Sequence, residues 1–403
     1  MNANTASKVT TPSVGSQEGK PPFDTARLDR LMEEAGLGAL LVTSKHSIQY
    51  LLGGYRYFFY DYMDAHGLSR YLPFFVYIKG KPFASTYVAS PMETYEQELG
   101  KFWVSQFDFK NMTTGEYAAA AVRSLQRAAC LSGRIGVEIG FLPTDAYRVL
   151  ASGLPDADIV DATFTLELLR ALKSPRELDI LRVASEKVID SLLTVMAGHG
   201  AGTTKQALFD AVRREEESRG LKFEYCLTSM GRSFNRAPSD QVWQKGDVLA
   251  LDSGGNYKGY IGDLCRMAYL GEPDQELHDL LGEIEGIQQA ARKPIRAGAR
   301  GGDIYAEPEA AVARCANHGE LSFVAHGMGI VSHEAPWLTD RCSVPYPAYH
   351  ADRPLEAGMV ISIETTLLHP LRGFIKLEDT LAVTADGWEA FGDHGRGWNR
   401  GLG

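Results

Sequence analysis

The apolar pattern of this chain changes near Lys173. Over residues 20–165, predicted helices alternate with short apolar runs, which indicates an α/β layer. Beyond residue 220 the apolar runs are longer, as in 248–252 and 359–368, and two helical stretches lie between them. The second pattern predicts an α+β domain with a curved, antiparallel sheet.

A helix-start signal follows the change directly. In the string Ser174-Pro175-Arg176-Glu177, serine can cap the helix, proline fits the first turn, and glutamate can close a capping box. The first residues are rich in Ser, Thr and Gly and lack an apolar core segment, so we expect a disordered tail and no signal peptide. The predicted division is a tail over 1–20, a smaller α/β domain over 21–168, and a second domain over 169–403.

The composition limits the cellular compartments and the classes of partner that we expect for this protein. The 403 residues are 44% hydrophobic and 23% charged, with a formal net charge of −10, which argues against nucleic acid or an anionic membrane as a partner. No apolar run approaches the roughly 18 residues that a membrane span needs. The five cysteines are scattered and form no CxxC pair, which favours reduced thiols. We therefore expect a soluble, cytoplasmic protein.

Acidic residues interrupt the long apolar runs of the second half. Asp252 and Asp263 stand eleven positions apart in LALDSGGNYKGYIGDLCR. The Gly-Gly-Asn segment between them predicts a turn, which would bring two carboxylates on adjacent strands toward one point. Glu364 in VISIETTL and Glu378 in IKLEDTLAV are flanked by apolar residues. A carboxylate buried in a sheet is costly unless it is paired or binds a metal.

Two histidines, His326 and His333, add nitrogen donors in AHGMGIVSHEAP. A single acid in a strand is most often a solvated edge residue, but four such acids and an imidazole, each in an apolar frame, favour a metal site. Oxygen-rich ligation with one imidazole suits two divalent ions of Mn, Fe, Co or Zn, and suits a structural zinc site poorly. Trp337 stands where an HExxH helix would need its second histidine.

These strings carry a family resemblance. KGDVLALDSGG, GYIGDLCR, HGMG with HEAP, LEAGMVISIE and KLEDT resemble the ligand strings of the pita-bread metallohydrolases, which include prolidase, aminopeptidase P, methionine aminopeptidase and creatinase. The segments LDRLMEEAGLGALLVTSKHSIQYLLGG and LLRALKSPRELDILRVA resemble the start and the junction of the amino-terminal domain of creatinase and prolidase. The resemblance implies a carboxy-terminal pita-bread fold, after a smaller creatinase-like α/β domain, and an Xaa-Pro dipeptidase-like hydrolase.

The resemblance also implies roles for the site residues. Asp252 would bind one of two metal ions, with Mn favoured over Co, Fe or Zn, and Asp263 and Glu378 would bridge the pair. His326 and Glu364 would complete the second site. Two cations would make a water nucleophilic, with Glu364 as its general base. His333 would contact the scissile carbonyl or the oxyanion, and its alternative is a structural hydrogen bond.

Two positions depart from the peptidase pattern. A histidine that shuttles protons in prolidase-like enzymes falls at Asn235 or Arg236, and neither can do so at neutral pH. The family arginine two positions before the last glutamate is Lys376, which lacks the bidentate fork. Alternatives therefore remain open: creatinase-like C–N hydrolysis, an elimination like that of dimethylsulfoniopropionate lyase, or a non-catalytic binding protein.

Substrate contacts have a weaker signal. The run Tyr55–Gly67 is unusually aromatic, and its rings can simply be part of a core. In the relatives the first domain covers the active site of a dimer mate, so a homodimer is expected. Arg56 and Tyr60 could then contact a dipeptide or another small substrate in the partner's pocket. Lys376 is the third candidate for a substrate contact.

Overall fold

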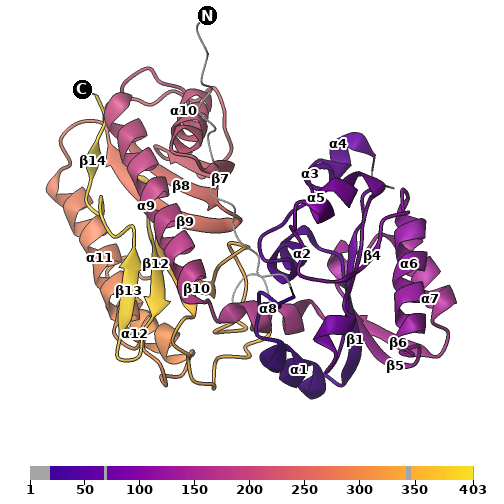
Figure 1. The fold of residues 1–403 in the computed structure, drawn as a ribbon. Coiled ribbons are helices and arrows are strands. Elements are labelled where there is room, and N and C mark those ends of the chain that lie inside the picture. Colours follow the sequence, from indigo (N-terminus) through magenta and orange to yellow (C-terminus); the bar gives the residue numbers. More distant parts are fainter. Residues whose placement is uncertain (1–18, 68–69, 342–345, 403) are drawn as a thin grey trace, which may run out of the picture. The chain divides into compact units, whose positions relative to one another are not determined.

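The structure is a computed structural model that describes residues 19–67, 70–341 and 346–402 (Figure 1). The chain divides into two compact units, Met1–Leu166 and Glu167–Gly403. Residues 1–18 of the predicted tail lie outside the described residues, as does Cys342. The other four cysteines are free thiols. Within the described segments, no helix has the length and apolar character to cross a membrane.

The first unit is built on a six-stranded mixed sheet in the order β4-β3-β2-β1-β5-β6. The pairs β1–β2 and β2–β3 are antiparallel, whereas β1–β5, β5–β6 and β3–β4 are parallel. Its strands are β1 (Leu37–Val42), β2 (Phe74–Ile78), β3 (Thr86–Val88), β4 (Gln106–Asp108), β5 (Gly133–Val137) and β6 (Ala157–Asp161).

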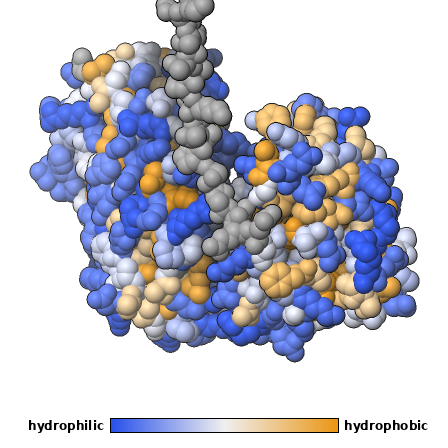
Figure 2. Space-filling model, viewed as in Figure 1, coloured by the Kyte–Doolittle hydropathy of each residue, from blue (hydrophilic) through white to orange (hydrophobic). Residues whose placement is uncertain are grey.

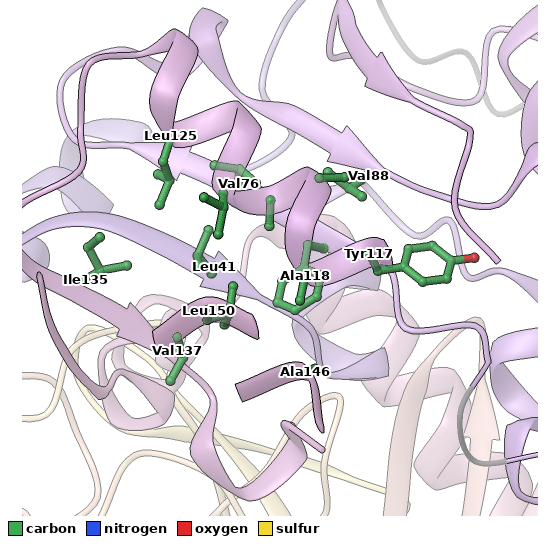
Figure 3. Close-up of a cluster of buried hydrophobic side chains, with 14 of the residues drawn as sticks. Leu41, Val76, Val88, Tyr117, Ala118, Leu125, Ile135, Val137, Ala146 and Leu150 are labelled. Carbon is green, nitrogen blue, oxygen red and sulfur yellow. The ribbon is translucent and has the colours of Figure 1, made fainter. Parts of the chain in front are cut away.

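Helices connect these strands and cover the sheet. They are α1 (Thr25–Glu34), α2 (Lys45–Leu51), α3 (Phe58–Asp61), α4 (Met63–His66), α5 (Thr94–Glu98), α6 (Thr114–Arg127) and α7 (Thr144–Gly153), with short 3-10 turns at η1 (Pro82–Ala84), η2 (Pro91–Glu93) and η3 (Ile139–Phe141). Leu125 of α6 and Leu150 of α7 belong to one buried apolar cluster with Leu41 and Val76 of the sheet (Figure 3). The predicted α/β layer is confirmed.

The second unit begins within α8 (Thr163–Ala171) and continues into α9 (Pro175–Gly198). The predicted capping box is present: the Ser174 hydroxyl accepts from the Glu177 amide, and the Glu177 carboxylate accepts from the Ser174 amide at 2.8 Å. The remaining helices are α10 (Lys205–Ser218), α11 (Gln275–Arg292) and α12 (Asp303–Val312).

The sheet of the second unit is antiparallel along its main path, β10-β11-β12-β9-β8-β7. Two short strands join it, β13 beside β12 and β14 beside β9. The bounds are β7 (Lys222–Met230), β8 (Val248–Tyr257), β9 (Tyr260–Tyr269), β10 (Leu321–Gly327), β11 (Val360–His369), β12 (Gly373–Val383), β13 (Trp388–Phe391) and β14 (Asn399–Arg400). The predicted α+β class of this half is confirmed.

The hairpin of β8 and β9 is present, but the predicted position of its turn is wrong. Strand β8 continues through Gly254 and Gly255, and the chain turns at Lys258 and Gly259, whose φ angles are 52° and 94°. A Cβ on Gly255 would lie 2.7 Å from Leu221 and Val188 side-chain atoms, and one on Gly254 would overlap the Tyr225 ring. These glycines serve close packing inside the sheet rather than a turn.

The two faces of this sheet have different partners. Helices α9, α10 and α11 cover one face (Figure 1), where the buried Glu216 of α10 meets Ser253. On β12, Asp379 points to this helical face and contacts Gln288 of α11 at 3.0 Å. It is also ion-paired with three arginines, Arg266, Arg292 and Arg396. Because side chains alternate along a strand, the neighbouring Glu378 points to the other face.

Hydrophilic side chains predominate on the outer surface seen in Figure 2.

Candidate metal centre

Five strands that are neighbours in the sheet each contribute one predicted ligand. Asp252 lies on β8, Asp263 on β9, His326 on β10, Glu364 on β11 and Glu378 on β12. Glu364 and Glu378 are directly opposite each other in the register. Like charges in that position are destabilising unless a cation lies between them. The structure therefore brings together the residues that were predicted from five separate strings.

The donor atoms form overlapping groups, and within each group the donor atoms lie within 4.8 Å of one another. One group is His326, Glu364 and Glu378, and another is Asp252, Asp263 and Glu378, so Glu378 is common to both. A third joins Asp263 to His326 and His333. Four of the five ligand candidates are buried, and the side chain of Glu364 is 15% exposed. Such a set suits divalent cations, which prefer carboxylate oxygens and accept imidazole.

His326 has the geometry of a ligand. Its Nδ1 lies 3.2 Å from the Gly327 carbonyl, which can only accept, so Nδ1 carries the proton and donates. Nε2 then has a free lone pair. This buried atom makes no hydrogen bond among the described residues and lies 3.8 Å from Glu364 Oε1 and Glu378 Oε1. A metal ion would satisfy all three atoms, so the residues fit the cofactor that the fold implies.

Lys376 lies among the carboxylates. Its Nζ is 2.6 Å from Asp252 Oδ2, 2.5 Å from Glu364 Oε2 and 2.7 Å from Glu378 Oε2. Burial alone would lower the pKa of Lys376, but these carboxylates raise that pKa well above its usual value. The sequence suggested a substrate contact for Lys376, whereas its three contacts here are with ligand candidates.

Arg236 also approaches this cluster. Its guanidinium is ion-paired with Asp252 Oδ2 and lies over the Phe374 ring, 5.3 Å from the centroid. The neighbouring Asn235 instead accepts a hydrogen bond from the Ala237 amide. Of the two residues at which the family resemblance would place a shuttle histidine, Arg236 is thus a cation that holds the carboxylate of a ligand candidate. The sequence identified the substitution but gave no signal for this contact.

The carboxylates also perturb one another. Burial raises the pKa of Asp263 well above its usual value, and the negative charges of Glu378 and Asp252 raise it further. Burial also opposes ionisation of Glu378, yet the ammonium group of Lys376 holds the pKa of Glu378 well below its usual value. Ser362 Oγ donates to Glu378 Oε1 at 2.8 Å and supports the ionised form.

His333 stacks on His326, with ring centroids 3.7 Å apart and planes at 14°. His333 as a whole is exposed, but partial desolvation of its ring lowers the pKa of His333 to about 4, and the neighbouring His326 contributes to the shift. The next residue, Glu334, is buried and ion-paired with Arg170 Nε at 2.9 Å and Lys173 Nζ at 3.3 Å. These two ion pairs of Glu334 were not predicted from the sequence, where the string around Arg170 and Lys173 indicated only a domain junction.

Arg56 and Tyr60 belong to the first unit, and their contacts there are local. Arg56 Nε is 3.1 Å from Asp61, and Arg56 Nη2 is 3.3 Å from His46 Nδ1. The buried Tyr60 hydroxyl donates to the Thr43 carbonyl. Their predicted role in a partner's pocket stays a prediction.

Two family models match the chain. The model of Metallopeptidase family M24 matches residues 179–385, which include every ligand candidate. The model of the Creatinase/Prolidase N-terminal domain matches residues 25–172.

Individual relatives agree with these matches. An uncharacterized peptidase of Bacillus subtilis is 26% identical over 261 residues, covering 63% of this chain and 71% of the relative. An Xaa-Pro dipeptidase of Lactobacillus delbrueckii subsp. lactis is 23% identical over 380 residues, covering 91% and 95%. The solved Xaa-Pro dipeptidase from Bacillus anthracis superposes with a TM-score of 0.79 at 20% identity, covering 93% of this chain and 98% of that one. The predicted pita-bread fold with its creatinase-like first domain is confirmed.

Proposed function

Because this chain belongs to metallopeptidase family M24 and is a metal-dependent hydrolase, we propose that it hydrolyses dipeptides, with Xaa-Pro dipeptides as the first substrates to test. The observation that carries the proposal is the convergence of four carboxylates and His326 from five adjacent strands, beside a second histidine. The likeness to the Lactobacillus relative named Xaa-Pro dipeptidase, which is covered over 95% of its length, supports the substrate class.

We expect Asp252, Asp263, His326, Glu364 and Glu378 to be the metal ligands. The family resemblance implies a pair of divalent ions, and Mn²⁺ is the first candidate because the donor set is rich in oxygen. A bound divalent ion supplies a Lewis acid that polarises a carbonyl and makes a water acidic near neutral pH.

The chain's own residues would perform the remaining steps. Glu364 is the partly exposed carboxylate of the set, and it would accept the proton of the attacking water at Oε1 or Oε2. His333 would donate a hydrogen bond to the oxygen of the scissile carbonyl as negative charge develops there. Glu334, held by Arg170 and Lys173, would fix the backbone that carries His333.

Metal reconstitution tests the proposal. Protein stripped with EDTA is reloaded with Mn²⁺ or Co²⁺ and assayed on Gly-Pro and Ala-Pro. We expect metal-dependent hydrolysis, lost together with metal binding in Asp263→Ala. The matched control Asp386→Ala removes an exposed carboxylate and should change neither. A fully loaded protein that cleaves no dipeptide would contradict the proposal.

A second candidate function is favoured because the family resemblance places a shuttle histidine at Asn235 or Arg236, and Arg236 is instead ion-paired with Asp252. The alternative is C–N hydrolysis or an elimination on a small metabolite. A panel of small betaines and amidines, assayed beside the dipeptides, separates the two. Turnover of a betaine or amidine without dipeptide cleavage would establish the alternative.

We further propose a cytoplasmic homodimer in which the first domain, 21–168, covers the partner's catalytic domain, 169–403. Free cysteines and the absence of CxxC pairs support a reducing compartment. Sedimentation should give a dimer. Arg56→Ala and Tyr60→Phe should raise the KM for a dipeptide without changing metal content, and an unchanged KM in both would remove these residues from the pocket.

A further inference from the structure

We propose that Lys376 takes the place of one metal ion, so that each chain binds a single divalent cation beside a permanently held ammonium group. The inference rests on the proposed metal dependence and deepens it. It concerns the two ligand groups that share Glu378: His326 with Glu364, and Asp252 with Asp263.

The oxygens of the two opposed glutamates are divided between two partners. Lys376 Nζ contacts the Oε2 atoms of Glu364 and Glu378, at 2.5 and 2.7 Å. His326 Nε2 faces the Oε1 atoms of the same residues, at 3.8 Å from each. Each glutamate therefore presents one oxygen to the ammonium group and the other to the lone pair of His326. Only the second arrangement leaves donor atoms converging on an unfilled position.

Asp252 already has two cationic partners. Lys376 Nζ is 2.6 Å from Asp252 Oδ2, and the Arg236 guanidinium pairs with the same oxygen. A metal ion bound to the three oxygens that Lys376 contacts would need distances of about 2.1 Å. It would then lie within about 5 Å of the ammonium nitrogen, where two buried positive charges repel strongly.

The charge balance agrees with this assignment. Two of the four carboxylate charges are compensated by Lys376 and Arg236. One divalent ion compensates the other two, whereas a second ion would leave two uncompensated positive charges in a buried site, which is costly. Every residue of β12 is buried, so the ammonium group is held in the sheet rather than exchanged with solvent.

Metal counting tests the inference. Metal-free protein is equilibrated with excess Mn²⁺, and bound Mn is measured by mass spectrometry and by electron paramagnetic resonance. We expect one ion per chain, with the spectrum of isolated Mn²⁺. Lys376→Met removes the ammonium and should raise the count to two, with the spectrum of a coupled pair. The control Lys187→Met removes a half-buried lysine outside the site, which donates to the Arg219 carbonyl, and this variant should still bind one ion.

Two ions per wild-type chain, or one ion in a folded Lys376→Met protein, would overturn the inference. If Lys376→Met does not fold, Lys376→Gln retains a neutral donor to the carboxylates and should also bind two. The wild-type count decides independently of either variant. Dipeptide hydrolysis is measured separately: one bound ion without hydrolysis contradicts the proposed function alone, and hydrolysis with two bound ions contradicts this inference alone.

Discussion

At the scale of single residues, Glu378 is the centre of the site. It belongs to both ligand groups, accepts from Ser362, contacts Lys376 and lies opposite Glu364. A carboxylate shared in this way is stable only while cations surround it. His333 differs, because its ring stacks on His326 instead of meeting these glutamates.

A substitution of His333 should therefore separate catalysis from metal binding. His333→Ala removes a donor to the developing negative charge, so we expect kcat to fall about 10²- to 10³-fold. The Mn content should stay at the wild-type value. His278→Ala, which removes an exposed histidine on α11, is the control for both measurements. A loss of bound Mn in His333→Ala would instead make His333 a ligand.

Glu216, on the helical face of the sheet, should make the free energy of unfolding depend on pH. Burial raises the pKa of Glu216 to about 7 from an unfolded value near 4.5. The folded state thus binds this proton more tightly, and the free energy of unfolding should fall as the pH rises from about 4.5 to 7. Ser253 Oγ, 2.7 Å from Glu216 Oε1, can accept from the protonated form and donate to the Tyr225 carbonyl.

Glu216→Gln keeps a donor to Ser253 and removes the ionisation. We expect the variant to be more stable than the wild type above pH 7, by about 2–3 kcal/mol. Denaturant unfolding at several pH values measures the difference. Glu217→Gln, at an exposed neighbouring position, should keep the wild-type slope. A parallel slope in Glu216→Gln would show that Glu216 is not the titrating group.

At this scale the sequence predicts the burial of short acidic side chains better than it predicts the contacts of long basic side chains. Asp252 and Glu378 stand in apolar strand-like runs, and this context alone indicates that their short side chains are buried on one face. Lys376 occupies the same strand as Glu378, but the position of Nζ depends on a flexible stem and on carboxylates of two other strands, β8 and β11. The contacts of Arg236 and Arg170 likewise join residues distant in the chain, so spacing could not predict them.

At the scale of elements, the β8–β9 hairpin shows why a turn signal can mislead. Gly-Gly-Asn has the composition of a turn, yet Gly254 lies within β8 opposite Asp263. Packing against Tyr225 excludes any side chain at that position. The sequence shows where a glycine stands. Only its neighbours in the structure show whether a positive φ angle or the lack of room for a Cβ requires it there.

Paired glycine substitutions test this difference. Gly254→Ala should destabilise the protein by about 1–3 kcal/mol, because its Cβ would overlap the Tyr225 ring. Gly286→Ala lies on α11 with no atom within 4 Å of the added Cβ, and should stabilise the protein by about 0.5–1 kcal/mol. Thermal unfolding reports both. Equal effects of the two substitutions would contradict the packing explanation.

At the scale of the whole molecule, all five ligand candidates belong to Glu167–Gly403. A ligand that binds only the folded form stabilises it, by about 2.7 kcal/mol when present at 100 times its Kd. We expect calorimetry to resolve two transitions, of which Mn²⁺ raises only one. His326→Ala, which removes the imidazole from the group with Glu364 and Glu378, should abolish that shift. A single transition that Mn²⁺ raises as a whole would show that the two units unfold together and would contradict this expectation.

The adjacent acids Glu378 and Asp379 on β12 have two different kinds of positively charged partner. Those of Asp379 are arginines of the chain itself, and they are present from the moment of synthesis. Those of Glu378 are Lys376 and, in the proposed function, a metal ion that the surroundings must supply. In a cell short of metal, the protein should therefore accumulate in a folded, metal-free form. The ion pairs on its helical face would be formed, and its metal site would be empty. Such a population can be activated later without refolding.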